Sequence, residues 1–392
     1  MQFGSSVAIC FGRSGVEIKN VSKDKTIEAF FALLRGGLWE KEVRLLPFGE
    51  IDFPALQQLA EEQSVVGLIA AGMEQISDTK IPKQDLLQFI GQTLQLEQQN
   101  TAMNYFIGVI VDKMRDAGIY TLLVKGQGVA QCYARPLWRS CGDVDLFLDA
   151  ENYRKAKEYL IPLAASVDEE DAEVMHLGMT IKPWVVELHG TLRGGISKRQ
   201  NALIDAIQED TFQNGKVRVW NDNGTDVFLP SPDNDVIIIF NHFVDHFYRG
   251  GLGVRQVCDW CRLLWTYRDS IDRALLDERL RRMGFMSEWK GFAALAVDYL
   301  GMPVEAMPLY DDSRCWSRKA KRMIAFILEV GNFGHNRDNS FYERYPYVIF
   351  KLISFWRHIG DFFRHLSIFP KNSINVFTRT FFNGLRVMSK GD

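Results

Sequence analysis

The 392-residue sequence is poor in cysteine and lacks a basic leader, internal repeats and low-complexity linkers. Its six cysteines, at positions 10, 132, 141, 258, 261 and 315, are too scattered for a disulfide framework, so we expect reduced thiols and a cytoplasmic protein. The first eleven residues are only mildly apolar, and no signal peptide is predicted there. Charged residues interrupt the aromatic-rich C-terminal segment too often for a transmembrane helix.

A formal net charge of −3 hides an asymmetry between the body and the tail. Residues 341–392 contain eight lysines or arginines and three acids, which gives this tail about +5 and the preceding residues about −8. From Tyr347 to Leu366, polar residues recur every three or four positions among bulky apolar ones, a pattern that predicts a helix. This helix is either buried against the body or lies on a membrane surface, in which case the protein is peripheral to the inner face of the membrane. Nucleic acid contact is a third alternative, although the acidic body argues against a long footprint and specific DNA binding is not expected.

The predicted fold is α+β, with a mixed sheet, flanking helices, a helical N-terminal region and a C-terminal helical bundle. Residues 24–117 have mostly helical spacing, whereas 119–124 and 142–148 have strand patterns. Two further strands, 175–181 and 184–189, flank Lys182-Pro183 as a hairpin. Ser231 and Pro232 fit the start of another helix. We expect four parts: a helical region (1–104), a catalytic domain (105–229), a helical domain (230–340) and basic aromatic helices (341–392).

The segment from Arg139 to Leu146 carries the clearest chemistry. Asp143 and Asp145 follow Gly142 in an apolar run, and residues two apart on a strand point to the same face. Like charges this close repel unless a cation lies between them. The pair therefore predicts a divalent-metal site, most naturally for Mg²⁺ that holds substrate phosphates.

Residues 105–265 resemble the nucleotidyltransferase superfamily. Within the superfamily, the chain most resembles bacterial members that have Lys-Gly followed by Arg-x-x-Gly-Asp-x-Asp-Leu. This pattern is present here from Lys125-Gly126 to Leu146. The commoner superfamily pattern has Gly-Ser after the first strand, where this chain has Gly126-Gln127, so the usual serine contact to phosphate is missing.

The resemblance implies a third carboxylate on a neighbouring strand. Glu187 is a charge in an otherwise apolar strand, which is costly unless the charge is paired or metal-bound. We interpret Asp143, Asp145 and Glu187 as metal ligands and catalytic residues for Mg²⁺ or Mn²⁺, with Glu187 also expected to help deprotonate the acceptor. The alternative for Glu187 is a salt bridge to Arg139 or Lys125 without a metal.

Further residues are predicted to bind nucleotide phosphates. Lys125 ends the first strand, and the glycine-rich turn after it leads into a helix N-terminus, where backbone amides bind anions. The alternatives are a solvated strand end for Lys125 and an ion pair with Asp143 for Arg139. The predicted nucleotide- and phosphate-binding residues are Lys125, Gly126, Gln127, Arg139 and Gly142.

Polar residues after the sheet form a second candidate group. His242 and His246 lie four apart, on one face of the predicted helix. A zinc site that combines them with Cys258 and Cys261 has suitable Cys spacing, but the cysteines fall in a strongly helical stretch, so buried polar residues or a cleft opposite the metal site are preferred. The predicted cleft residues are His189, His242, His246, Arg255 and Asp259.

The resemblance implies transfer of a nucleoside monophosphate from an NTP, such as ATP, to an acceptor hydroxyl. The acceptor is a small molecule, an RNA end or a protein side chain, and the residues do not choose among these. Three alternatives stay open: a non-catalytic nucleotide-binding or scaffold relative, a membrane-surface protein that acts near lipid-linked intermediates, and toxin-like transfer onto tRNA. The three intact carboxylates argue against the scaffold relative.

Overall fold

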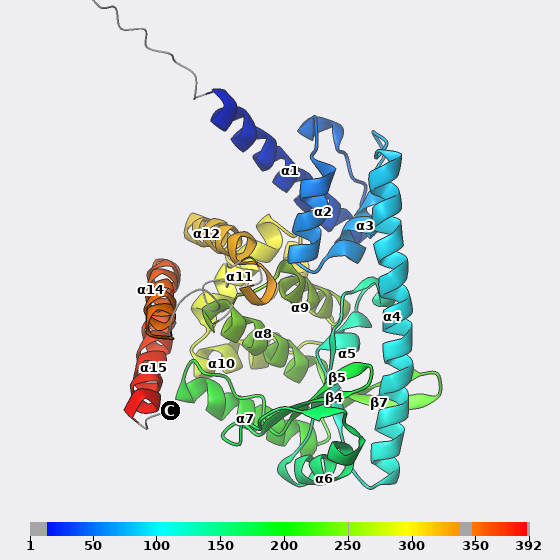
Figure 1. The fold of residues 1–392 in the computed structure, drawn as a ribbon, viewed down its shortest axis with the longest axis vertical. Coiled ribbons are helices and arrows are strands. Elements are labelled where there is room, and N and C mark those ends of the chain that lie inside the picture. The colour runs from blue at the N-terminus through cyan, green and yellow to red at the C-terminus, as the bar shows by residue number, and fades with distance from the viewer. Residues whose placement is uncertain (1–13, 250, 335, 337–346, 390–392) are drawn as a thin grey trace, which may run out of the picture.

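The computed structural model describes residues 14–249, 251–334, 336 and 347–389 (Figure 1). The first eleven residues and residues 341–346 of the tail, on which sequence expectations were placed, lie outside the described residues. Before the sheet the described chain is helical, as predicted, and α4 is a single long helix along one edge of the molecule (Figure 1). These elements are α1 (Ser14–Trp39), η1 (Leu46–Phe48), α2 (Phe53–Glu62), α3 (Val66–Met73) and α4 (Lys83–Asp116).

A mixed sheet with strand order β1-β2-β5-β4-β3 forms the centre of the catalytic region. β2 runs parallel to β5, and the other neighbours are antiparallel. The predicted strand that carries the Asp pair and the predicted hairpin are both present. The strands are β1 (Leu122–Val124), β2 (Asp143–Phe147), β3 (Ser166–Val167), β4 (His176–Ile181) and β5 (Trp184–His189). The short and flanking helices are α5 (Gly126–Ala130), η2 (Pro136–Trp138), α6 (Ala150–Leu160), η3 (Ile161–Leu163) and α7 (Lys198–Phe212).

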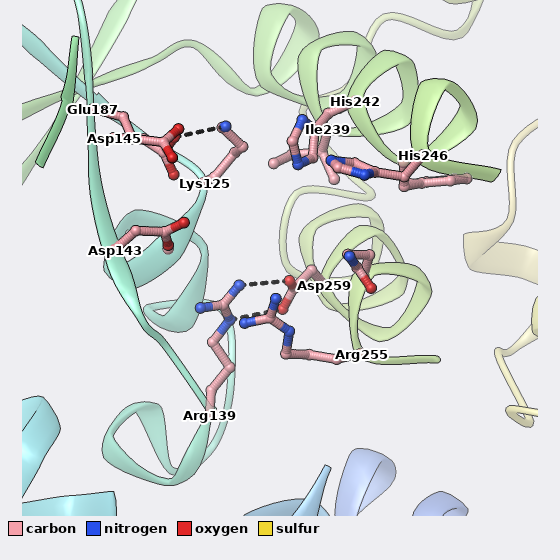
Figure 2. A pocket seen from close by; sticks show the side chains of 13 residues that line it. Lys125, Arg139, Asp143, Asp145, Glu187, Ile239, His242, His246, Arg255 and Asp259 are labelled. Atoms are coloured by element: carbon pink, nitrogen blue, oxygen red, sulfur yellow. Dashed lines mark hydrogen bonds and ion pairs between the residues drawn. The ribbon is translucent and has the colours of Figure 1, made fainter. Parts of the chain in front are cut away.

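The two faces of the sheet have opposite character because successive strand residues alternate in direction. Val144, Leu146, Val186 and Leu188 lie on the apolar face and are buried with side chains of α4 and α6. The other face carries the acidic residues of β2 and β5 and looks toward the helices that follow the sheet (Figure 2). The apolar pattern thus fixes the direction of the acidic side chains.

A second, two-stranded sheet consists of β6 (Val217–Asp222) and β7 (Thr225–Pro230). The turn between them is Asn223-Gly224, and both residues have positive φ, 50° and 98°. Asn-Gly is a strong hairpin signal for this reason. The sequence analysis left this hairpin out although its turn signal is present.

The helices after the hairpin form the bundle that faces the sheet. They share one buried core with α1 to α4, and this core includes Phe30, Phe240, Trp260 and Trp289. The bundle therefore packs against the N-terminal helices, and α8 also contacts β7 of the small sheet. The predicted domain boundaries stay predictions. Its elements are α8 (Pro232–Arg249), α9 (Val254–Thr266), α10 (Arg273–Met283), α11 (Met286–Asp298), η4 (Val304–Ala306), α12 (Arg314–Val330) and η5 (Asn332–Gly334).

The basic tail contains two helices, α14 (Tyr347–Leu366) and α15 (Pro370–Ser389). They pack on each other, with the rings of Phe362 and Phe377 4.3 Å apart. The bounds of α14 match the predicted helix. None of the described helices is long and apolar enough to cross a membrane.

The turn between α14 and α15 is buried against the bundle, whereas part of α14 faces outward. His365 and Phe369 are buried, and the His365 ring lies 4.8 Å from that of Phe247 in α8. Trp356 and Phe363, by contrast, are 67% and 61% exposed. The polar residues that recur along α14 therefore do not all face solvent. His365, one of these polar residues, is buried, whereas the aromatic residues Trp356 and Phe363 are exposed.

Candidate active site

The acidic residues predicted from the sequence lie side by side on β2 and β5. Asp145 is paired with Glu187 in the parallel register, and Asp143 lies one pleat earlier on the same face of β2. All three side chains line one cavity (Figure 2). We call Asp143, Asp145 and Glu187 the acidic wall.

Lys125 forms an ion pair with the central member of the acidic wall. Its Nζ lies 2.7 Å from Asp145 Oδ1, and both side chains are largely buried. Burial opposes the charge of Lys125, but attraction to Asp145 prevails and raises the pKa of this lysine. Lys125 also has a positive φ of 56°, which a lysine rarely adopts, so the turn after β1 directs the ammonium group toward the sheet. The expectation of a solvated strand end for Lys125 is wrong.

Two histidines contact the acidic wall from the sheet itself. His189 Nε2 lies 2.7 Å from Asp145 Oδ1 and 3.4 Å from Glu187 Oε2. His176 Nε2 lies 3.2 Å from the same Glu187 oxygen. Hydrogen bonds from His176 and His189 hold the pKa of Glu187 well below its usual range. A carboxylate with so low a pKa is a weak base, so this environment suits Glu187 to cation binding more than to the general-base role expected for it.

Asp143 differs from the other two carboxylates. Repulsion by Asp145, followed by burial, raises its pKa above the ordinary value, and the nearby cations Lys125 and Arg255 offset this only in part. Negative charge is thus in excess at the Asp143 end of the acidic wall. A divalent cation with carboxylate ligands would relieve this repulsion.

Helices α8 and α9 form the opposite side of the cavity, which has a volume of about 140 Å³ (Figure 2). The cavity therefore lies between the sheet and the helical bundle, at an interface where ligand sites are common. The side chains that line it come from five elements or their connecting loops. They are Lys125, Gly126, Arg139, Asp143, Asp145, Glu187, Ile239, His242, Phe243, His246, Arg255, Gln256 and Asp259.

Arg139 is held in place from α9. It donates two hydrogen bonds to Asp259, from Nε at 2.9 Å and from Nη2 at 2.7 Å, and Tyr133 donates a third to the same carboxylate at 2.7 Å. The partner of Arg139 is therefore Asp259. The expectations of an ion pair of Arg139 with Asp143 or with Glu187 are wrong. Two fixed bonds leave the guanidinium little freedom to rotate.

Three buried donors at the cavity have no hydrogen-bond partner among the described residues: Arg139 Nη1, Arg255 Nε and Gln256 Nε2. Arg255 is held by its Nη1, which donates to the carbonyl of Ser140 at 2.6 Å. Burial, and then repulsion by Arg139, lowers the pKa of Arg255. We call Arg139, Arg255 and Gln256 the donor wall. Buried donors without partners are costly, so an anion in the cavity would stabilise this arrangement.

Two histidines of α8 complete the cavity. The rings of His242 and His246 lie 4.4 Å apart, as expected for positions four apart on one helix face. Burial lowers the pKa of both histidines, and the charge of Lys125 lowers it further. Both rings are therefore neutral near pH 7 and suited to hydrogen bonding rather than to balancing charge.

The model of the uncharacterised nucleotidyltransferase family matches residues 49–301. The chain belongs to this family. No curated protein matches it. Among solved structures, it is similar to that of an antigenic nucleotidyltransferase-like protein from Paracoccidioides brasiliensis, with 16% identity and a TM-score of 0.29 over 47% of this chain and 90% of that one.

The resemblance inferred from residues 105–265 is thus confirmed at the level of the family, and the match extends on both sides of that stretch. The α+β fold is confirmed as well, with a mixed sheet and flanking helices. The nucleotidyltransferase family indicates nucleotidyl transfer in general terms. The metal, the donor, the acceptor and a bacterial origin are finer expectations that the family match does not test.

Not every predicted residue of this family member lines the cavity. Gln127 is buried and donates to Asn100 at 2.8 Å, so its side chain is directed toward α4. Gly142 is exposed, and only Gly126 of the three predicted glycine-turn and loop positions contributes to the lining. The helix that follows Lys125, α5, has five residues, which is too short for a strong dipole. The anion site expected at its N-terminus is therefore not favoured.

The cysteines of the zinc alternative belong to the core of the bundle. Cys258 and Cys261 are fully buried in α9 among apolar side chains. Within the described part of the chain, the only group of three or more possible ligands within 4.8 Å of one another is His176, Glu187 and His189. The zinc site with His242 and His246 is therefore wrong.

Two polar residues of the site were not predicted: Gln256, which lines the cavity, and His176, which contacts Glu187 beside it. The apolar lining residues Ile239 and Phe243 were not predicted either. His176 begins the first strand of the hairpin that ends in His189, and the strand alternation that places Glu187 could have aligned the two histidines. Gln256 is the third residue of α9, and its Oε1 accepts a hydrogen bond from the backbone N–H of Gly253 at 2.9 Å. This local cap holds the amide at the start of α9, where it lines the cavity.

Proposed function

We propose that this protein transfers a nucleoside monophosphate from a nucleoside triphosphate to an acceptor hydroxyl. The family match supports nucleotidyl transfer in general, and the cavity supports the finer statement. One observation carries it: the acidic wall and the donor wall line a single cavity (Figure 2). A metal-bound triphosphate needs both, because carboxylates bind the metal ion and guanidinium or amide donors bind phosphate oxygens.

The acidic wall consists of carboxylates, the ligand type that a divalent cation such as Mg²⁺ prefers. Its residues offer three carboxylates on one face of the sheet, and repulsion raises the pKa of Asp143, so a cation is favoured at that end. Asp143, Asp145 and Glu187 would hold Mg²⁺ or Mn²⁺, which would neutralise charge on the triphosphate and on the leaving pyrophosphate. Lys125, fixed by Asp145, supplies a further positive charge at the same edge.

The donor wall would orient the phosphates. Arg139 Nη1, Arg255 Nε and Gln256 Nε2 each have a hydrogen without a partner among the described residues, and Asp259 prevents Arg139 from turning toward the carboxylates. In the reaction the acceptor oxygen forms a bond to the α-phosphorus, and the bond from that phosphorus to the bridging oxygen of the β-phosphate breaks. Pyrophosphate leaves with the electron pair, and the acceptor proton passes to a carboxylate of the acidic wall and then to water.

The test is calorimetric titration of ATP, GTP, CTP and UTP with Mg²⁺ into the wild type and Asp143→Asn. Asp143 is preferred to Asp145 because Asp145 has buried partners whose loss would disturb folding. Asp312→Asn, an exposed acid, is the charge-matched control. We expect Mg²⁺-dependent binding of one nucleotide that Asp143→Asn loses and the control retains.

Binding that survives in Asp143→Asn would remove the metal assignment. Binding without release of pyrophosphate, in the presence of extracts that supply small-molecule, RNA and protein acceptors, would favour the non-catalytic relative. Growth arrest that requires Asp143, together with labelled tRNA, would identify tRNA as the acceptor.

A further inference from the structure

The β4–β5 hairpin brings two histidines next to Glu187, the member of the acidic wall that lies on β5. His176 and His189 are directly paired in the antiparallel register, and Glu187 lies two residues before His189 on the same face. Gly178 is paired with Glu187, so no side chain from that position competes for the carboxylate. The carboxylate of Asp168 occupies the space above Gly178 and adds negative charge next to the group.

Two of the three distances within this group match those of a tetrahedral metal site. Glu187 Oε2 lies 3.2 Å from His176 Nε2 and 3.4 Å from His189 Nε2, and one ligand atom from each residue lies within 4.8 Å of the others. Metal–ligand bonds of about 2.0–2.1 Å at a tetrahedral angle separate two donor atoms by about 3.3–3.4 Å. Each imidazole nitrogen is therefore spaced from the carboxylate oxygen as two ligands of one ion would be.

We propose that His176, Glu187 and His189 bind a first-row transition metal ion of the Zn²⁺ type. Imidazole nitrogen favours zinc and its neighbours in the first row, whereas Mg²⁺ prefers an octahedral set of oxygen ligands. A set of two nitrogen donors and one oxygen donor therefore favours a zinc-type ion over Mg²⁺, which is proposed for the acidic wall. Three protein ligands leave a fourth position for water or Asp145, whose Oδ1 lies next to His189.

This site shares Glu187 with the proposed Mg²⁺ site, which gives it a regulatory consequence. A zinc-type ion bound by Glu187 removes one carboxylate from the acidic wall and breaks the hydrogen bond between His189 and Asp145. We expect such an ion to weaken Mg²⁺-dependent nucleotide binding. This consequence rests on the proposed function, but the metal site itself does not.

The experiment is a titration of the full chain with Co²⁺, followed by the visible absorption of the bound ion, without nucleotide. The test variant is His176→Gln, because His176 lies outside the proposed catalytic machinery and its side chain is 37% exposed, so the fold tolerates its loss. His358→Gln, an exposed histidine of α14, is the matched control. His176→Cys replaces the nitrogen ligand with a thiolate, which also binds zinc-type ions.

We expect one Co²⁺ per chain, displaced by Zn²⁺ and not by a large excess of Mg²⁺. His176→Gln should weaken the affinity more than about tenfold, since even the loss of a group that only supports a ligand costs this much. His358→Gln should bind as the wild type does, and His176→Cys should bind more tightly than His176→Gln. Absence of the visible absorption, equal affinity in His176→Gln, or displacement by Mg²⁺ would overturn the proposal. Because nucleotide is absent, these outcomes do not depend on the proposed transferase activity.

Discussion

Arg139 and Asp259 are 120 residues apart in the sequence and are joined by two parallel hydrogen bonds beneath the cavity. Arg139 precedes β2 and Asp259 lies in α9, so the pair connects the sheet to the helical bundle. Both side chains are almost fully buried. The bond therefore fixes the donor wall and the interface that contains the cavity at the same time.

Asp259→Asn should destabilise the protein strongly. It removes the negative partner of a buried guanidinium, a change that typically costs about 3–5 kcal/mol. Urea unfolding of the variant measures this. Asp277→Asn, which breaks the exposed pair with Arg281, is the control and should change stability by less than about 1 kcal/mol. Equal effects of the two substitutions would contradict a structural role for the Arg139–Asp259 pair.

Arg255→Gln should weaken nucleotide binding without lowering the stability of the fold. Folding buries Arg255 beside Arg139, and relief of the resulting repulsion in the variant opposes the loss of the hydrogen bond to the Ser140 carbonyl, so the free energy of unfolding should change little. Loss of a charged hydrogen bond to phosphate costs about 1.5–3 kcal/mol, or roughly a 10- to 150-fold weaker nucleotide affinity. Calorimetry and urea unfolding on the same samples check both. Weaker binding accompanied by lower stability would indicate a structural role instead.

Glu288→Gln should change the pH dependence of stability. Burial raises the pKa of Glu288, while hydrogen bonds from Tyr248 and Asn372 to its Oε1, each 2.8 Å, offset this only in part. Its Oε2 has no hydrogen-bond partner among the described residues. Because the folded state holds this proton more tightly than the unfolded state, stability falls as pH rises from about 4.3 toward the raised pKa, and levels off above it.

The glutamine variant cannot ionise, so its free energy of unfolding should rise relative to that of the wild type across this pH window. Urea unfolding at a series of pH values from about 4.5 to about 8 measures the difference. Tyr248 does not titrate in this range, because burial raises its pKa well above the ordinary value. Parallel curves for the two proteins would contradict the shifted pKa of Glu288.

Phe369→Ala tests whether packing of the tail helices α14 and α15 against the helical bundle stabilises the protein. Phe369 is 1% exposed at the turn between α14 and α15 and packs near Phe292 and Gly291. Truncation of a buried phenylalanine to alanine costs about 3–5 kcal/mol. Phe363→Ala, at a position that is 61% exposed, should change stability by no more than about 0.5 kcal/mol. A neutral Phe369→Ala in thermal or urea unfolding would show that the tail does not stabilise the bundle.

Trp356 and Phe363 lead us to expect contact with an anionic membrane surface. They lie seven residues apart on α14, which places them on one helix face, and the tail carries a net positive charge. Burial of one large apolar side chain contributes about 1.5–3 kcal/mol, so the double variant Trp356→Ser/Phe363→Ser should lose more than about 100-fold in affinity. Co-sedimentation with anionic and neutral vesicles measures it. No binding of the wild type to anionic vesicles, or no difference between the proteins, would exclude this contact.

The strand pattern around Asp143 was predictable because it is local. Apolar residues at every second position determine which face of β2 is buried. Because successive strand residues alternate in direction, Asp143 and Asp145 both point to the other face. The hairpin that carries Glu187 was predictable for the same reason. The Asn223-Gly224 turn was equally local, and its omission was an oversight of a signal that the sequence contains.

The partners of these residues were not predictable from local patterns. Nothing near Arg139 indicates that its carboxylate comes from α9, and nothing near Gln256 indicates that it lines the same cavity as the acidic residues of the sheet. The family resemblance supplied the third carboxylate, but the two histidines that contact it depend on the register of the hairpin.

The sequence by itself determined the periodic elements, the direction of the acidic side chains and the family to which the chain belongs. Only the tertiary structure decided that Lys125 is paired, that Arg139 is held by Asp259, and that His176 joins Glu187 and His189. The physical reason is the distance along the sequence over which each effect acts. Backbone alternation and turn preference act over a few residues, whereas the cavity arises where the sheet meets a helical bundle encoded later in the chain, with Arg139 and Asp259 joined across 120 residues.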